Sequence, residues 1–360
     1  MRFDAPTQIL HGAGTRHELP EQLLSLGCKK LLLVTDNYLV RSRVIEPFLA
    51  ALEAASIRVW LFDGVQPDPT DENVADGRRA FQQFGAEAIA AIGGGSSIDC
   101  AKAIRFAERH VPLIAIPTTA GTGSEATKVI VITDTTNGIK KMTLDPRLMP
   151  DVAIVDFELT LSMPKPLTAY VGVDTLTHGI EAFVSRKASE LTDALARSCM
   201  HLCGKFLQRA WDNASDREAR SGMSIAALEG GLAFTNSSVA LVHGMARPLG
   251  ALFHIPHGLS NAVLLPAVTR YSWPSAQQRY AEVAQILGVV PEREVFAGWL
   301  ESLNRDLEIP RLRDCCEGDW ERFASVLPKM AVDALASGSP ANNPRIPLAE
   351  EIEELYRASW

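Results

Sequence analysis

One carboxylate and three imidazoles stand at spacings that suit a catalytic divalent cation. Asp174 and His178 are four residues apart in VGVDTLTHGIEAF, and His243 and His257 follow in LVHGMA and IPHGLSNA. Residues i and i+4 share one face of a helix, so Asp174 and His178 can bind the same ion if their segment is helical. One oxygen and three nitrogens suit Fe2+ or Zn2+, and a substrate oxygen would find a position if the geometry opens to five-coordinate. Spacing alone leaves a second interpretation equally open, in which these are ordinary core histidines.

A strand, a glycine turn and a helix start follow one another in AIAAIGGGSSIDCAKAI, residues 88–104. Such a segment presents backbone N–H groups to a pyrophosphate, and the helix dipole adds to the attraction. The triple glycine matches neither GxGxxG nor GxxxxGK[ST], so it is not one of the usual nucleotide fingerprints. A plain tight turn is the alternative.

Two further segments favour nucleotide binding. LIAIPTTAGTGSEAT, residues 113–127, places hydroxyl side chains directly after a buried strand, where phosphate, ribose or nicotinamide contacts are expected in an open α/β sheet. In KKLLLVTDNYL the strand ends at Asp36, and an acid there can bind the adenosine ribose and repel a 2′-phosphate, which favours NAD over NADP. The alternative for Asp36 is a helix cap.

The elements that must position these residues change character near residue 157. Before it, strands and amphipathic helices alternate, which predicts a mostly parallel sheet with helices on both faces. After Asp156 helical patterns dominate, so we expect two domains, 1–157 and 158–360. Strands are predicted at 30–35, 57–62, 88–92, 113–116, 128–133 and 152–155, and helices at 41–55, 71–84, 97–107, 168–185, 187–211, 216–235, 275–287 and 348–357.

Composition agrees with two globular domains. The chain has 360 residues, 47% of them hydrophobic and 22% charged, with a net charge of −8. This acidic balance argues against nucleic acid and membrane partners, and the apolar runs are shorter than the roughly 20 residues of a membrane span. Six scattered cysteines and an N-terminus without a signal pattern indicate a cytoplasmic protein.

Taken together, the motifs resemble those of the iron-containing alcohol dehydrogenases. The resemblance rests on VTDNYL, GVQPDPTDENV, GGGSSIDCAK, IPTTAGTGSEAT, DTLTHGIEAF, HGMARPLGALFHIPHGLSNAVLLP and ASGSPANNPR, which run in the family's order from about residue 32 to 346. It implies a Rossmann-like α/β domain that binds NAD(P) and an all-α, metal-binding domain, the fold shared with dehydroquinate synthase. It further implies an active site in the cleft between the domains, a small alcohol or aldehyde substrate, and a homodimer.

Carried over residue by residue, the resemblance assigns the metal ligands and the cofactor contacts. The metal ligands would be Asp174, His178, His243 and His257. The cofactor-binding residues would be Asp36, Gly93, Gly94, Gly95, Ser96, Asp99, Thr118, Thr119, Thr122 and Lys140.

The chain departs from the family's pattern at one block. Many members read HGMAH, where the second histidine is credited with proton relay, but this chain reads HGMAR and has Arg247 there. A guanidinium stays charged near neutral pH and cannot act as a general base, so the relay would pass through water, a ribose hydroxyl or His254. Arg247 could instead bind a carboxylate, phosphonate or sulfonate of the substrate, or bridge helices as a structural residue.

Three classes of function follow from these observations. We expect a metal-dependent, NAD-linked oxidoreductase that interconverts an alcohol and an aldehyde or ketone. A maleylacetate reductase-like enzyme acting on an anionic carbonyl compound is the alternative, although those reductases read HHxxCH where this chain reads VHGMAR. A dehydroquinate synthase-like lyase and a metal-free binding protein are the remaining candidates, and the complete ligand set argues against the latter.

Overall fold

The computed structural model describes residues 2–108, 111–136 and 138–360, which form two compact units, Met1–Ser162 and Met163–Trp360. We refer to these as unit 1 and unit 2. The sequence predicted a division near residue 157, five positions earlier.

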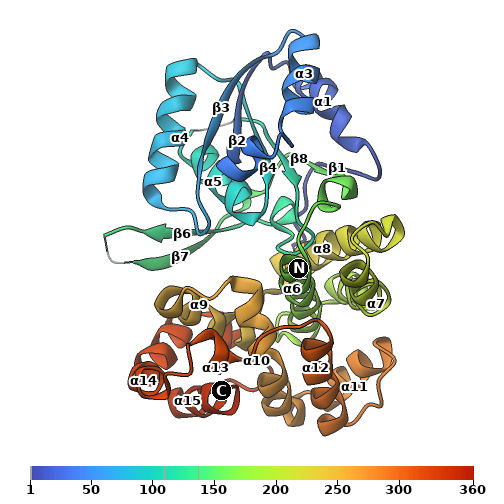
Figure 1. Ribbon diagram of the computed structural model, residues 1–360, viewed down its shortest axis with the longest axis vertical. Coiled ribbons are helices and arrows are strands. Elements are labelled where there is room, and N and C mark those ends of the chain that lie inside the picture. Colours follow the sequence, from blue (N-terminus) through green and yellow to red (C-terminus); the bar gives the residue numbers. More distant parts are fainter. Residues whose placement is uncertain (1, 109–110, 137) are drawn as a thin grey trace. The chain divides into compact units, whose positions relative to one another are not determined.

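Unit 1 is built on a six-stranded sheet in which every neighbouring pair of strands is parallel (Figure 1). The strand order is β1-β8-β5-β4-β2-β3. The strands are β1 (Gln8–His11), β2 (Lys30–Asp36), β3 (Arg58–Val65), β4 (Ala88–Gly93), β5 (Leu113–Pro117) and β8 (Val152–Val155). Its helices are η1 (Thr15–Glu18), α1 (Leu19–Ser25), α2 (Asn37–Arg41), α3 (Glu46–Ala54), α4 (Asp71–Phe84), α5 (Gly95–Ala107), η2 (Ser124–Ala126), η3 (Pro146–Leu148) and η4 (Phe157–Thr160).

Helices cover both faces of this sheet because its central strands are apolar on both sides. In β2, Leu31 and Leu33 pack with α1 and α3, whereas Leu32 and Val34 pack with α4 and α5. All four side chains are fully buried. Continuous apolar strands of this kind are typical of parallel sheets, and the predicted two-sided architecture is confirmed.

The strand order reverses direction between β2 and β4. The chain passes from β2 to the edge strand β3, then returns to β4 on the other side of β2 and continues to β5 and β8. In open α/β sheets, ligands bind outside the carboxyl ends of the strands at such a switch point. The loops that follow β2, β4 and β5 are the three segments that the sequence singled out.

Several details of unit 1 differ from the prediction. The helix expected at 41–55 is the shorter α3, and Arg43, which lies in the left-handed region with φ of 62°, separates it from α2. The segment expected as a strand at 128–133 is β6 (Val129–Asp134), which pairs antiparallel with β7 (Ile139–Leu144) outside the main sheet (Figure 1). The edge strand β1 was not predicted, since its four residues are too few to show a period.

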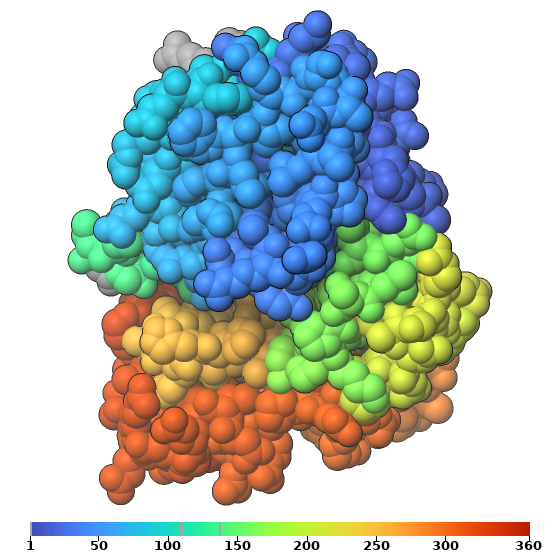
Figure 2. Space-filling view, turned by 45° about the horizontal axis from the view of Figure 1, so that its top comes forward, coloured from blue at the N-terminus to red at the C-terminus, as the bar shows by residue number. Residues whose placement is uncertain are grey.

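Unit 2 is helical, with no strand among residues 163–360, as predicted. On the face drawn in Figure 2, the chain of α7 and α8, coloured yellow-green to yellow, lies beside that of α6 in green. The helices are α6 (Lys165–Val184), α7 (Glu190–Asp212), α8 (Arg217–Ser237), α9 (Leu241–Phe253), α10 (His257–Ser272), η5 (Trp273–Ser275), α11 (Gln277–Ile286), α12 (Arg293–Asp306), α13 (Leu312–Cys315), α14 (Trp320–Ala336), η6 (Ser339–Asn342) and α15 (Ala349–Ala358).

Side-chain caps account for several of these helix starts. Ser189 accepts a hydrogen bond from the Thr192 N–H, Asp216 from the Ala219 N–H and Asp319 from the Arg322 N–H. Each cap satisfies a backbone donor that would otherwise lack an intrahelical partner, an effect worth about 1 kcal/mol.

All six cysteines are free, and every one except Cys315 is buried. Cys28 and Cys100 belong to unit 1, and the other four to unit 2.

No single helix in the described part of the chain has the length and apolar composition needed to cross a membrane. Helices α8 and α9 together have the length and apolar composition of a membrane span, but the pair is bent by 104°.

Candidate functional site

Helix α6 carries two of the predicted metal ligands on one buried face. Asp174 and His178 are 2% and 3% exposed, and they stand four residues apart within the helix. The His178 Nε2 atom lies 3.7 Å from Asp174 Oδ1. The helical interpretation of this segment was therefore sound, and the two side chains meet as expected.

The third and fourth candidates come from the starts of α9 and α10. His243 lies in the first turn of α9, and His257 is the first residue of α10. Gly258 lets α10 begin against α6, because a Cβ atom at this position would lie 2.4 Å from the Tyr170 carbonyl oxygen and 3.3 Å from Asp174 Cβ. A side chain there would push His257 away from Asp174.

The four side chains do not converge equally. Ligand atoms of Asp174, His178 and His243 all lie within 4.8 Å of one another in a buried group. His257 lies at the edge of this group, with its Nε2 atom 3.9 Å from Asp174 Oδ1 and a side chain that is 41% exposed. Four electron-pair donors gathered in this way match the chemistry of a divalent cation site.

Charges within the cluster shift the pKa values of their neighbours. Burial alone would raise the pKa of the Asp174 carboxyl, but the charges that His178, His257 and His243 can carry lower it below its usual value. Burial would lower the pKa of His243, yet its hydrogen bonds to Asp174 and Glu181 raise it to about 9. The cluster thus favours an ionised carboxylate beside positive charge.

Asn261 is a fully buried member of the cluster that the sequence analysis missed. Its Nδ2 atom donates to Asp174 Oδ1 at 2.6 Å and lies 3.1 Å from His243 Nε2 and 3.2 Å from His257 Nε2. The three atoms around this amide nitrogen are all acceptors, and a cation bound in the cluster would have the same atoms as neighbours. The signal available in the sequence was its spacing, four residues after His257 on the same helix.

Glu181 is a second member that was missed. It is 2% exposed, and its Oε2 atom lies 2.7 Å from Nδ1 of His243. It stands three residues after His178 on α6, so the same helical spacing could have identified it.

The two predicted catalytic residues follow His243 along the same helix. Arg247 is one turn after His243 on α9, and its guanidinium donates to the Ser337 carbonyl oxygen at 3.4 Å. Burial lowers the pKa of Arg247, and the negative charge of Glu181 opposes this shift. His254 ends α9 in the left-handed conformation with φ of 55° and is exposed.

In unit 1, the glycine turn and the hydroxyl-rich loop lie against each other. A Cβ atom on Gly95 would lie 2.8 Å from Thr122 Cγ2, and one on Gly94 would lie 3.5 Å from Thr119 Cγ2. The Thr118 N–H donates to the Gly93 carbonyl oxygen at 2.9 Å. The loops after β4 and β5 therefore form one surface around the N-terminus of α5, where the glycines leave the backbone N–H groups uncovered by side chains of their own.

Asp99, which was predicted to contact the cofactor, makes two hydrogen bonds within unit 1. Its Oδ1 atom accepts from the Ser124 hydroxyl at 2.6 Å, and its Oδ2 atom accepts from the Val131 N–H at 2.9 Å. These bonds fasten the loop after β5 and the start of β6 to helix α5. Ser96, which was predicted with it, lies in the first turn of α5 and is partly buried.

A buried lysine reinforces this loop. Lys102 is fully buried and donates to Ser124 Oγ at 2.8 Å, Thr127 Oγ1 at 2.9 Å and the Val129 carbonyl oxygen at 3.1 Å. Burial lowers the pKa of Lys102 to about 8 against the opposing charges of Asp99 and Glu125. Burial also raises the pKa of Glu125 to about 7.

Two other residues predicted to bind the cofactor, Asp36 and Lys140, interact with neighbouring residues of unit 1. Asp36 caps α2, because its Oδ1 atom accepts from the Leu39 N–H at 3.0 Å, so the capping role considered from the sequence is present. Lys140 on β7 pairs with Asp68 through an Nζ–Oδ1 distance of 2.7 Å.

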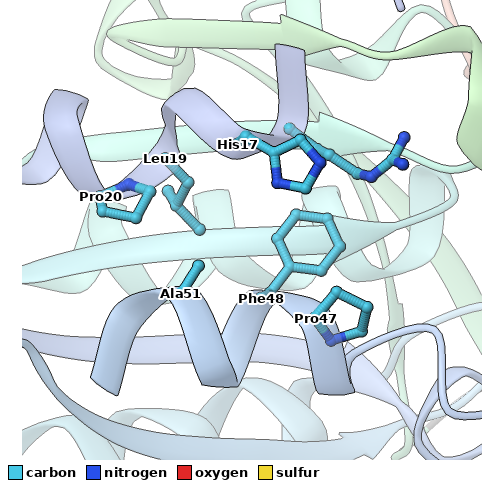
Figure 3. Close-up of a pocket in the computed structure, with 7 residues that line it drawn as sticks. His17, Leu19, Pro20, Pro47, Phe48 and Ala51 are labelled. Carbon is cyan, nitrogen blue, oxygen red and sulfur yellow. The ribbon is translucent and has the colours of Figure 1, made fainter. Parts of the chain in front are cut away.

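A surface hollow in unit 1 coincides with none of these residues. Figure 3 shows it between the start of α1 and helix α3, with the rings of Pro20, Pro47 and Phe48 around it. Arg16 at its rim is paired with Asp156 at 2.7 Å and with Glu158 at 2.6 Å. Its lining is largely apolar, and we assign it no ligand.

The sequence matches one known family along nearly its whole length. Residues 6–157 match the iron-containing alcohol dehydrogenases, and residues 168–360 match the C-terminal region of the Fe-containing alcohol dehydrogenase family. The chain therefore belongs to the iron-containing alcohol dehydrogenase family and is an oxidoreductase, as the motifs indicated.

Named relatives cover nearly all of the chain. A 1,3-propanediol dehydrogenase of Citrobacter freundii is 37% identical over 94% of this chain and 94% of its own length. A lactaldehyde reductase of Escherichia coli is 37% identical over 97% of both chains. An NAD-dependent methanol dehydrogenase of Bacillus methanolicus is 34% identical over 99% of this chain and 98% of its own.

Solved structures show the same fold. A 1,3-propanediol oxidoreductase superposes with a TM-score of 0.95 at 35% identity and covers 100% of this chain and 99% of its own. A sulfoacetaldehyde reductase from Bifidobacterium kashiwanohense, solved in complex with NAD+, superposes with a TM-score of 0.89 at 28% identity over 99% and 98% of the two chains.

Proposed function

We propose that this protein is a metal-dependent, NAD(H)-linked oxidoreductase that interconverts a small alcohol and an aldehyde or ketone. The observation that carries the proposal is the buried cluster in which ligand atoms of Asp174, His178 and His243 lie within 4.8 Å of one another, with His257 beside them. A divalent cation, Fe2+ or Zn2+, would act there as a Lewis acid on the substrate oxygen.

The cofactor side of the proposal rests on the loops at the switch point of the sheet. The backbone N–H groups of Gly94, Gly95 and Ser96 would bind the pyrophosphate at the start of α5, and the hydroxyls of Thr118, Thr119 and Thr122 would line the same surface. The nicotinamide would accept or donate the hydride. Asp36 at the end of β2 would favour NAD over NADP. One relative is named NAD-dependent.

Arg247 supports a second candidate, a reductase of an anionic carbonyl compound. It stands four residues after His243, so the two side chains extend from the same face of α9. Its planar guanidinium fits a carboxylate or sulfonate, and one structural neighbour is named a sulfoacetaldehyde reductase. His254, exposed at the end of α9, is our candidate for handing a proton to or from solvent.

One assay panel tests both candidates. The metal-free protein is loaded with Fe2+ or Zn2+, and NADH and NADPH oxidation are followed with neutral aldehydes and with aldehydes that carry a carboxylate, phosphonate or sulfonate. Metal-dependent NADH oxidation would support the oxidoreductase, and a preference for anionic aldehydes would support the Arg247 role. No turnover by the metal- and cofactor-loaded protein with any aldehyde would oppose both. We also expect a cytoplasmic homodimer, which sedimentation would test for its oligomeric state.

A further inference from the structure

Glu181 is a carboxylate that touches the candidate metal cluster without belonging to its predicted ligands. It lies on α6 seven residues after Asp174 and three after His178, so the three side chains follow one another along a single helix face. Its side chain is only 3% exposed. A buried carboxylate needs compensation by several hydrogen bonds, and its partners identify its role.

Three hydrogen-bond partners of Glu181 lie on or next to α9. Oε1 accepts from the Val242 N–H at 2.6 Å, and Oε2 accepts from the Ala240 N–H at 2.8 Å. The third partner is Nδ1 of His243, 2.7 Å from Oε2. Backbone N–H groups can only donate, so this site requires an acceptor at both carboxylate oxygens.

The third contact fixes the proton on the imidazole. An ionised carboxylate only accepts, so when His243 gives up a proton to act as a ligand, the proton that remains must lie on Nδ1. The lone pair of Nε2 is then directed to the other side of the ring, where Asp174 Oδ1 lies 3.5 Å away. A ligating histidine needs this arrangement, in which the second nitrogen donates to a carboxylate.

The two backbone contacts fix the start of the helix that carries this ring. Ala240, the N-cap residue of α9, has no side chain that could cap it. Glu181 supplies that cap from a different helix, and its negative charge also suits the positive end of the α9 dipole. One side chain thus sets both the position of the His243 backbone and the orientation of its ring.

We propose that Glu181 is a positioning residue that holds His243 with its proton on Nδ1 and its Nε2 atom ready to bind the cation. The inference rests on the proposed metal site and adds a residue that determines its affinity. Glu181 acts through His243 and is not itself a ligand.

The substitution Glu181→Gln separates this role from simple packing. The glutamine side chain has the same shape, but its amide NH2 group would face a backbone N–H or His243 Nδ1, so one cap bond is lost in either orientation. If the NH2 group faces Nδ1, it favours the ring form with the proton on Nε2, which cannot bind a cation through that atom. Outer partners of metal ligands typically contribute about 10- to 100-fold in metal affinity.

The experiment compares wild type, Glu181→Gln, Glu181→Asp and the control Asp319→Ala. Asp319 caps α14 at an exposed position, so its loss weakens a helix start in the same unit without contacting the cluster. For each protein we would measure Zn2+ and Co2+ affinity by competition with a chromophoric chelator, and the Tm of the metal-free form. The Co2+ d–d spectrum and the ring N–H signal of His243 in the zinc-loaded form complete the set.

We expect Glu181→Gln to weaken Zn2+ and Co2+ binding about 10- to 100-fold and to change the Co2+ spectrum. Glu181→Asp, which keeps the charge, should recover part of the affinity, and Asp319→Ala should lower the Tm with unchanged metal affinity. In wild type the ring proton should be on Nδ1, strongly deshielded and slow to exchange.

Two results would overturn the inference. One is unchanged metal affinity in both Glu181→Gln and Glu181→Asp with only a lower Tm, because Glu181 would then be a helix cap alone. The other is a His243 ring proton on Nε2 in the zinc-loaded wild type, a result that does not depend on any variant folding. Failure of the wild type to bind either ion would instead overturn the proposed metal site, and the inference with it.

Discussion

Unit 1 and unit 2 assemble their candidate sites in different ways. In unit 1, the residues proposed to bind a nucleotide lie at or just after the ends of strands β2, β4 and β5, and much of the surface is backbone. In unit 2, the residues proposed to bind a cation project from three helices that are separated along the chain. The first kind of site depends on the absence of side chains at glycines, and the second on side chains that only packing can bring together.

The largest effect should follow removal of a side chain from the helical cluster. His178→Ala leaves two converging ligands, so we expect bound metal to be lost on dialysis and activity to fall by more than about 100-fold, since even outer partners contribute about 10- to 100-fold. Metal content per chain and NADH oxidation would be measured. The control is His201→Ala, an exposed histidine on α7. Retention of stoichiometric metal by His178→Ala would contradict the ligand assignment.

The loop site should respond to an added methyl group. Gly95→Ala places a Cβ atom 2.8 Å from Thr122 Cγ2, so the loops after β4 and β5 must separate. We expect the Kd for NADH to rise about 10-fold or more, a loss of at least about 1.4 kcal/mol, while metal content is unchanged. Gly298→Ala is the control, because nothing lies within 4 Å of a Cβ atom there. Equal NADH affinity in both variants would show that this turn does not hold the nucleotide.

Arg247 tests whether the helical unit also recognises charge on the substrate. Charge-assisted hydrogen bonds contribute about 1.5–3 kcal/mol, so Arg247→Ala should lower kcat/KM for anionic aldehydes about 10- to 100-fold and spare neutral ones. Arg293→Ala, an exposed arginine on α12, is the control. Equal losses for neutral and anionic aldehydes would leave Arg247 with a structural role only.

An effect of pH on stability is expected from the buried charges that fasten the loop in unit 1. The pKa of Glu125 is raised to about 7 from 4.5, so the folded protein holds this proton more tightly than the unfolded chain. The contribution of Glu125 to the free energy of unfolding therefore falls as pH rises from about 4.5 through about 7, by at most on the order of 3 kcal/mol.

Glu125→Gln cannot ionise, so its Tm relative to wild type should increase between pH 5 and pH 8. Thermal unfolding at several pH values measures the difference. The control Glu46→Gln changes an exposed carboxyl on α3 and should show no such trend. A constant difference across this range would mean that Glu125 remains ionised in the folded protein.

The loop site was easier to predict from the sequence than the helical one. A strand, its turn and the next helix are adjacent in the chain, so the local sequence of residues 88–104 determines most of their arrangement. Strand β4 and helix α5 begin and end within about two residues of the prediction. The helical cluster could be predicted only where the residues share a helix, as Asp174 and His178 do. His257 was also predicted as a ligand, and its side chain lies at the edge of the group.

What the sequence could not provide depends on packing between distant segments. The contact of Glu181 with His243 spans 62 positions, and that of Asn261 with Asp174 spans 87. Spacing along their own helices could have marked both residues as candidates, but no spacing rule predicts their partners on a distant helix. The break at Arg43 and the bonds made by Asp99 were equally invisible, because local patterns do not show which hydrogen-bond partners tertiary structure supplies.

The buried cysteines make it possible to follow the two units separately in one experiment. A thiol reagent reaches Cys28 and Cys100 only when unit 1 opens, and Cys199, Cys203 and Cys316 only when unit 2 opens. Labelling each site over time, with mass spectrometry of the peptides, therefore gives an opening rate for each half of the chain. Cys315, which is less buried, should be labelled first, and its labelling rate is the reference for the reactivity of the reagent.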